Sequence, residues 1–336
     1  MRRLLLVVPI FALAACSAGG SANILQARNT FSPSNISPDK RGKIALFDDP
    51  AGDPTPTGIT TGPDGALWFT DPGNDFVGRI TTQGQYTLQQ MSGTELGPGI
   101  ASGSDGNLWF TVAVSEGGIG SITTGGQVTL YDDSGGSYTQ YITSASDGTL
   151  WFTESNGTLG HRSKNGTIKH FHVGASNTEL EGIVQGPDGN FWMTEFAIGS
   201  HESNRVYRVS AKGNVKAFKV GAGPLMICVG PDKALWFTES GSGGIGRLTT
   251  SGKYTDFSLQ NPSGGPIGIA AGPDKALWFT EGSSGALIGR ITTFGKITRY
   301  GVTGDPSLQN ITQGPDGAMW FTSEMFPSAV GRITTK

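Results

Sequence analysis

Residues 62–70 read Gly-Pro-Asp-Gly-Ala-Leu-Trp-Phe-Thr, and residues 272–280 read Gly-Pro-Asp-Lys-Ala-Leu-Trp-Phe-Thr. An aspartate precedes every tryptophan of the chain by four residues, and the copies recur about every 42 residues. The 7 tryptophans are Trp68, Trp109, Trp151, Trp192, Trp236, Trp278 and Trp320. A motif repeated at a fixed period predicts one supersecondary unit per repeat, each packed against its neighbours.

Each repeat predicts four β-strands. A short apolar segment precedes the aspartate, and Pro-Asp-Gly supplies turn residues. Leu-Trp-Phe-Thr is apolar on both faces, as expected for a strand whose sheet lies between two others. A Gly-rich loop, an Ile-Gly-Arg segment (residues 245–250) and an alternating segment (residues 253–258) complete the repeat. Four strands in about 42 residues is the size of a propeller blade, so the sequence predicts an all-β, seven-bladed β-propeller.

The two ends of the repeat region complement each other. The seventh repeat stops at Lys336, after its third strand. Residues 42–47, Gly-Lys-Ile-Ala-Leu-Phe, match residues 295–300, Gly-Lys-Ile-Thr-Arg-Tyr, which form a fourth strand. We therefore expect the propeller to span residues 42–336, with its N-terminal strand completing blade seven. This arrangement also covers two exposed sheet edges.

The N-terminus predicts export. Arg2 and Arg3 precede the apolar run 4–15, which ends in Leu13-Ala14-Ala15-Cys16. This pattern resembles a bacterial lipoprotein signal, in which the cysteine is lipidated; an ordinary secretory peptide is the alternative. We expect residues 1–16 to be the signal, Cys16 to carry the lipid and residues 17–41 to form a flexible tether. The protein would then be an exported, membrane-anchored lipoprotein of the bacterial cell envelope.

Composition excludes several classes of protein. Charged residues make up 15% of the chain, against roughly a quarter in typical proteins, and the net charge is −3. A nucleic-acid binder that uses a basic face is therefore excluded. The 2 cysteines exclude a disulfide framework, and Cys228 lies in an apolar run that predicts a buried side chain. We expect a monomer.

The hairpin around each aspartate predicts a ligand site. Its first strand begins, and its second strand ends, at the same mouth of the ring. The first set of residues is Thr57, Pro98, Gln140, Glu181, Leu225, Ile267 and Gln309. The second set is Asp71, Val112, Glu154, Glu195, Glu239, Glu281 and Ser323. These positions predict a ring of carboxylates around a central opening, with Thr57, Gln140, Glu181, Glu195 and Gln309 facing a small-molecule or peptide ligand.

Arginines recur in the predicted third strand, at Arg79, Arg208, Arg247, Arg290 and Arg332. Blade two lacks both the acid and the arginine, since it has Val112 and Ser121. We therefore expect these arginines to pair with most of the acids at the ends of the second strands. Glu181 has no counterpart in the other repeats, so Glu181 and Glu195 are the predicted unpaired acidic site.

The repeat Gly-Pro-Asp-Gly-X-Leu-Trp-Phe-Thr-Glu, followed by Ile-Gly-Arg-Ile-Thr, closely resembles that of the virginiamycin B lyase (streptogramin lyase) family, across residues 42–336. The resemblance implies a seven-bladed propeller that linearises a cyclic depsipeptide by metal-assisted elimination. It also implies catalytic histidines just before Gly-Ile in two late blades, and a magnesium-binding carboxylate after Trp-Phe-Thr. The carboxylate positions are Glu239 and Glu281. The histidine positions here are Leu225, Ile267 and Gln309, so the general base is missing.

Three functions remain open. The first is a ligand-binding propeller of the virginiamycin B lyase type without streptogramin lyase activity. The second is a metal-assisted lyase that cleaves a C–O bond, using Mg²⁺ with Glu181, Glu195, Glu239 or Glu281. The third is a protein-interaction scaffold that uses loop residues 197–203. Because fold alone does not decide among these functions, the site must.

The histidines lie outside the predicted slots. His170 and His172 alternate along one predicted outer strand, so they share a face. We expect solvated side chains there, with a surface metal pair as the alternative.

Replacing Cys16 with serine should abolish lipidation and move the protein out of the membrane fraction. Labelling cells with a radioactive fatty acid and fractionating them measures both effects. Cys228→Ser is the matched control, because it removes the other cysteine and should keep the label. Label retained on Cys16→Ser would contradict the lipoprotein prediction.

Overall fold

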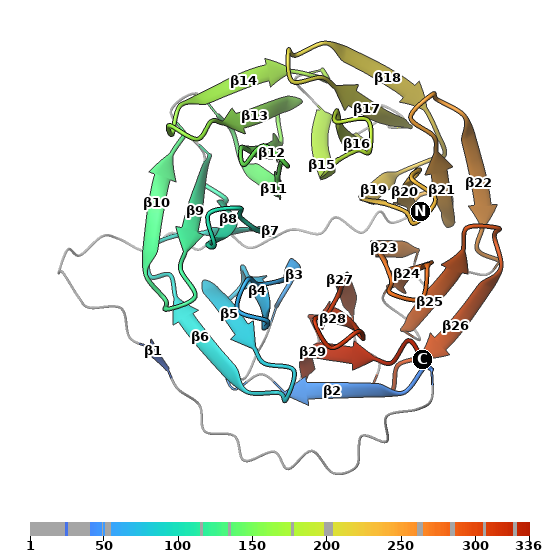
Figure 1. Cartoon of the computed structure of the whole chain (residues 1–336), viewed down its shortest axis with the longest axis horizontal. Coiled ribbons are helices and arrows are strands. Elements are labelled where there is room, and N and C mark those ends of the chain that lie inside the picture. The colour runs from blue at the N-terminus through green and yellow to red at the C-terminus, as the bar shows by residue number, and fades with distance from the viewer. Residues whose placement is uncertain are drawn as a thin grey trace, which may run out of the picture.

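The computed structural model describes residues 24–25, 41–48, 50, 55–114, 117–133, 136–175, 178–197, 204–260, 265–282, 286–304, 307–324 and 328–336. The predicted signal with Cys16, and most of the predicted tether, lie outside these residues. Seven antiparallel sheets are arranged radially around a centre (Figure 1), which confirms the seven-bladed propeller. None of the described residues lies in a helix with the length and hydrophobicity needed to cross a membrane.

Each blade begins at the centre of the ring. The innermost strands are β3 (Ile59–Thr61), β7 (Leu96–Ser102), β11 (Thr139–Ser144), β15 (Thr178–Gln185), β19 (Pro224–Val229), β23 (Pro266–Ala271) and β27 (Leu308–Gln313). The second strands are β4 (Leu67–Asp71), β8 (Leu108–Val112), β12 (Leu150–Glu154), β16 (Phe191–Ala197), β20 (Leu235–Glu239), β24 (Ala276–Glu281) and β28 (Met319–Ser323). The Pro-Asp-Gly or equivalent turn joins the two strands in each blade.

The third and fourth strands continue outward. The third strands are β5 (Phe76–Ile80), β9 (Gly118–Ile122), β13 (Thr158–Arg162), β17 (Arg205–Val209), β21 (Gly244–Leu248), β25 (Leu287–Thr292) and β29 (Ser328–Ile333). The outer strands are β6 (Tyr86–Gln90), β10 (Val128–Asp132), β14 (Ile168–His172), β18 (Val215–Lys219), β22 (Tyr254–Ser258), β26 (Ile297–Gly301) and, in blade seven, β2 (Ile44–Asp48).

Strand β2 comes from the start of the described propeller and pairs with β29 near its end. The antiparallel register places Ile44 opposite Ile333 and Leu46 opposite Gly331. Figure 1 shows the blue β2 along the outside of the red β29. Blade seven therefore contains strands from both ends of the repeat region. A further short strand, β1 (Ile24–Leu25), pairs with β6 and adds a fifth strand to blade one; it lies within the stretch predicted to be a tether.

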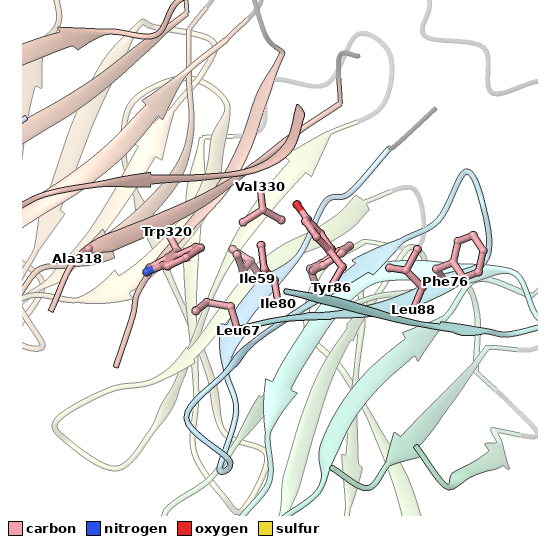
Figure 2. Close-up of a cluster of buried hydrophobic side chains, with 10 residues drawn as sticks. Ile59, Leu67, Phe76, Ile80, Tyr86, Leu88, Ala318, Trp320 and Val330 are labelled. Carbon is pink, nitrogen blue, oxygen red and sulfur yellow. The ribbon is translucent and has the colours of Figure 1, made fainter. Parts of the chain in front are cut away.

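The hydrophobic core lies between blades. One cluster joins Leu67 and Ile80 of blade one to Trp320 and Val330 of blade seven (Figure 2). The Trp320 indole stacks on Phe47 of β2 with ring centroids 5.3 Å apart. Each tryptophan thus contributes a large apolar surface to the contact between sheets, which is the main reason that the repeat requires it.

The turn aspartate holds the tryptophan and the arginine together. In blade five the indole Nε1 of Trp236 donates to Asp232 at 2.9 Å, and Arg247 Nε donates to the other carboxylate oxygen at 2.7 Å. Blades one, six and seven repeat both contacts. These bonds and the arginine's charge lower the pKa of Asp232 although burial opposes this.

The predicted pairing of these arginines with the acids that end the second strands is wrong. The antiparallel register places Arg247 opposite Trp236, toward the turn. The third strand begins beside Glu239 and runs antiparallel to the second strand, toward the turn. Arg247 therefore lies beside Asp232 and not beside Glu239.

A threonine in each second strand joins neighbouring blades. Thr238 Oγ1 accepts a hydrogen bond from Met226 N of its own blade at 3.0 Å and donates to Ile267 O of the next blade at 2.7 Å. Every blade makes the second bond, through Thr70, Thr111, Thr153, Thr194, Thr238, Thr280 and Thr322. Thr322 donates to Thr57 O of blade one at 2.7 Å, so this series of bonds closes the ring.

Replacing Thr238 with valine should lower the free energy of unfolding by about 1–3 kcal/mol, because a buried N–H and a partly buried carbonyl lose their partner. Chemical denaturation measures the change. Thr303→Val is the matched control, since it removes the same hydroxyl from an exposed position. Equal changes in the two variants would show that the inter-blade bond does not stabilise the fold.

Candidate functional site

The acids that end the second strands do not surround a central opening. Glu239 and Glu281 are fully buried. Glu239 accepts hydrogen bonds from Tyr254 Oη at 2.7 Å and from Gly221 N at 2.9 Å, and Glu281 is ion-paired with Arg299 at 2.6 Å. Tyr254 and Arg299 lie on the outer strands β22 and β26, so the carboxylates lie inside their blades. The predicted ring of carboxylates is therefore wrong.

Side-chain alternation along the strand explains the misplacement. Thr238 and Trp236 lie on the face of β20 that packs against blade six. Residues Phe237 and Glu239 take the opposite face, because successive side chains in a strand point to opposite sides. Phe237 accordingly packs against blade four, and Glu239 reaches Gly221 beside that blade.

Glu195 is also bound within its own blade. Its carboxylate accepts hydrogen bonds from Thr178 Oγ1 at 3.2 Å and Tyr207 Oη at 3.1 Å, and it is ion-paired with Arg205 at 3.2 Å. Leu180, rather than Glu181, lies opposite Glu195 in the register. The prediction of an unpaired Glu181–Glu195 site is therefore wrong for Glu195, and the two carboxyl groups are not brought together as a pair.

A polar cluster crosses the centre of the ring. Tyr141 lies on the innermost strand β11 of blade three, and its hydroxyl lies near enough to Asn310 of β27 in blade seven for that side chain to oppose the rise in its pKa. These blades lie on opposite sides of the ring (Figure 1), so the two side chains approach each other across the centre. The charge of Glu181 helps to raise the pKa of the Tyr141 hydroxyl, although burial contributes more. Glu181 of β15 therefore faces the same central cluster.

Glu181 has the properties of a proton-holding group. It is 9% exposed, and no ion pair to its carboxyl group is found among the described residues. Burial, with a smaller contribution from the negative charge of Glu179, raises the pKa of Glu181 to about 8. The carboxyl is therefore protonated at neutral pH and can donate a hydrogen bond.

The remaining predicted mouth residues begin the innermost strands. Gln140 and Gln309 are half-buried, and their carbonyls accept the Thr111 and Thr280 hydroxyls. The Gln309 side chain lies near Glu324 and partly opposes the rise in the pKa of that carboxyl, which burial causes. Thr57 is also half-buried, and its Oγ1 has no hydrogen-bond partner in the described structure. These residues lie on the same innermost layer as Glu181.

Tyr141, Asn310 and Glu324 are missing from the sequence prediction. Tyr141 and Asn310 replace the glycine of the Gly-Ile pair that begins most innermost strands, as in Gly268-Ile269. A departure from the repeat at a central position was therefore the signal that could have identified them. Glu324 follows β28, and no pattern in the sequence distinguishes it.

Blades five and six, which lie between blades four and seven (Figure 1), contribute apolar residues to the innermost layer. Leu225 of β19 and Ile267 of β23 are half-buried, and Tyr141 and Leu225 both pack against the hydrophobic cluster that contains Met226. The innermost layer thus presents amides, a carboxylic acid and a phenol from blades three, four and seven, and aliphatic side chains from blades five and six.

The two predicted magnesium ligands do not share a site. Neither Glu239 nor Glu281 belongs to a group of three or more metal-ligating side chains among the described residues. Arg299 already supplies a cation to Glu281. Binding of Mg²⁺ by Glu239 and Glu281 stays a prediction. The hydrogen bonds to Glu239 and the ion pair of Glu281 with Arg299 do not favour it.

Comparison with known proteins identifies the family. A model of the virginiamycin B lyase family matches residues 34–200 and 197–336. The chain belongs to this family. Virginiamycin B lyase from Staphylococcus aureus is 29% identical over 87% of this chain and 99% of that one, with a TM-score of 0.76. A streptogramin B lyase is 28% identical over 88% and 98%, with a TM-score of 0.77. No curated protein sequence matches the chain.

One solved relative bears directly on the chemistry of the virginiamycin B lyase family. It is a catalytically inactive histidine-to-alanine variant of the S. aureus lyase with quinupristin, 29% identical to this chain, with a TM-score of 0.75. In this member of the family the expected histidine positions hold Leu225, Ile267 and Gln309. Glu181 occupies the equivalent position in blade four.

Stability should fall as pH rises from about 5 to 8, and Glu181→Gln should weaken this fall. The folded pKa of Glu181 is raised above the ordinary value of 4.5 to about 8. The unfolded chain therefore binds fewer protons in this window, and its stability relative to the folded state increases. Burial raises the pKa of Glu239 to about 7, which adds to the effect.

Thermal unfolding across this pH range measures the prediction. Glu95→Gln is the control, because it removes a carboxylate that is exposed to solvent. A Glu181→Gln variant with the same pH profile as Glu95→Gln would contradict the assignment.

Proposed function

We propose that this member of the virginiamycin B lyase family is an exported, lipid-anchored propeller that binds a ligand at its centre and does not linearise streptogramins. The proposal rests on the residues at the positions where the family has its catalytic histidines. In this chain those positions hold Leu225, Ile267 and Gln309. Elimination requires a base that removes the proton beside the ester carbonyl, and aliphatic or amide side chains cannot accept that proton.

The same surface supports binding. Glu181 can donate a hydrogen bond while protonated, and Gln140 and Gln309 offer amides that both donate and accept. Leu225 and Ile267, in the two blades between Glu181 and Gln309, supply apolar contact. We infer an uncharged ligand with an apolar face and peptide-like polar groups, which includes cyclic depsipeptides.

A second candidate is a divergent lyase in which Glu181 is the base. Glu181 lies in blade four at the position that the family uses for histidine in later blades, and its pKa of about 8 suits proton transfer near neutral pH. Against it, the neighbouring blades three and five hold Gln140 and Leu225 at this position, so neither supplies a second acid or base there. The third hypothesis, an interaction surface at residues 197–203, falls almost wholly outside the described residues.

Incubating the full chain with a streptogramin B, with and without Mg²⁺, tests the proposal. Elimination opens the ring without adding water, so the product keeps the mass of the substrate but changes its chromatographic retention. We expect the cyclic form to persist while calorimetry detects binding. Loss of binding in Leu225→Asp, with Glu95→Gln unchanged, would place the ligand at the centre.

Ring opening by the wild type that disappears in Glu181→Gln would instead establish the second candidate. Binding that survives both Leu225→Asp and Glu181→Gln would contradict a central site altogether.

A further inference from the structure

Three metal-ligating side chains converge inside blade three, away from the centre. Glu154 ends the second strand β12, His170 lies in the outer strand β14, and Asp133 follows the outer strand β10 of blade two. His170 Nε2 lies 3.0 Å from Asp133 Oδ2 and 3.3 Å from Glu154 Oε1. One ligand atom from each residue lies within 4.8 Å of the other two. Among the described residues this is the one such group of three or more.

The carboxylates are buried and Glu154 is short of partners. The side chains of Glu154 and Asp133 are 0% and 2% exposed, and that of His170 is 25% exposed. Neither carboxylate oxygen of Glu154 has a hydrogen-bond partner in the described structure. Burial and the charge of Asp133 raise the pKa of Glu154 to about 8. Burying a carboxylate beside a second acid costs free energy unless a cation or several hydrogen-bond donors compensate its charge.

Blade six provides an internal comparison. Its acid Glu281 occupies the position of Glu154, and Arg299, opposite Gly289 in the register, occupies the position of His170, opposite Gly160. Arg299 supplies a permanent positive charge to Glu281 at 2.6 Å. In blade three a histidine replaces this arginine, so the permanent cation is missing.

Asp133 is a second departure from the repeat. It is the residue directly after an outer strand, and five other blades place a hydrophobic residue there: Met91, Val173, Val220, Leu259 and Val302. Met91, Val220, Leu259 and Val302 are buried. The contact between blades two and three therefore lacks the cation of blade six and carries an additional acid at one buried point, which is the reverse of what structural stability alone requires.

We propose that Asp133, Glu154 and His170 form a binding site for one divalent transition-metal ion of the Zn²⁺ or Mn²⁺ type. One imidazole and two carboxylates match the ligands that such ions accept, whereas Mg²⁺ and Ca²⁺ are bound by oxygen alone. Neighbouring ligands of a tetrahedral zinc ion lie about 3.4 Å apart for bonds of about 2.1 Å, close to the separations from His170 Nε2. In blade three the metal ion would supply the positive charge that Arg299 supplies to Glu281 in blade six.

The partly exposed imidazole leaves a route to solvent on its side of the group. Three protein ligands with a further position open to water is the arrangement of zinc sites that bind a substrate or a small anion. The site differs from the pair of histidines predicted at His170 and His172. His172 is exposed and does not belong to the group.

Titrating the untagged, chelator-treated full chain with ZnCl₂, MnCl₂ and MgCl₂ in a calorimeter tests the proposal. We expect one Zn²⁺ or Mn²⁺ per chain, a rise in the unfolding temperature on binding, and no comparable response to Mg²⁺. His170→Ala should weaken binding tenfold or more. His172→Ala, two residues along the same strand, should change it less than twofold.

His170→Arg is the decisive variant, because it copies blade six. It should raise the unfolding temperature without metal and abolish the rise caused by metal. Absence of a metal response in the wild type would overturn the proposal. So would binding by His170→Ala equal to that of the wild type, or equal losses in His170→Ala and His172→Ala, which would indicate a surface pair of histidines.

Discussion

The threonine hydroxyl of each second strand is the contact on which the ring depends. It accepts from a backbone N–H of its own blade in six of the blades and donates to an innermost carbonyl of the next blade in all of them, so two backbone polar groups depend on a single side chain. The bond from Thr322 to Thr57 O closes the series. Because these carbonyls belong to the residues that face the centre, the same contact fixes the backbone of the candidate ligand site.

The alternation of side chains then divides the molecule into two kinds of polar environment. Residues such as Thr238 lie on one face of a second strand, so the following acid, Glu239, lies on the other and is enclosed by the outer strand and the neighbouring blade. Three blades compensate the burial of this acid in different ways: with Tyr254, with Arg299, and with Arg205 and Tyr207. In blade three Glu154 instead lies beside His170 and a second acid, Asp133.

Chemistry is concentrated where individual blades depart from the repeat. Tyr141 and Asn310 replace glycines and meet across the centre, Glu181 places a carboxylic acid where other blades have neutral residues, and Asp133 replaces a buried hydrophobic residue. Each of these replacements buries a polar or acidic group, which costs free energy, at a position where most other blades have an apolar residue or glycine. Such costs persist in proteins mainly where a ligand, an ion or a reaction uses the group.

The number of blades, the four strands in each and the family resemblance follow from the repeat, because tryptophan, aspartate and turn residues recur at a fixed period and each strand's pattern is local. The repeat also identified Glu181 as an exception. The folded arrangement was needed to show that the arginines bind Asp232 and its equivalents rather than the acids ending the second strands. It was also needed to show that Glu195, Glu239 and Glu281 point into their blades and that Asp133 meets His170. These outcomes depend on strand register and on which face packs against which neighbouring blade, and both are set by contacts between residues far apart in the chain.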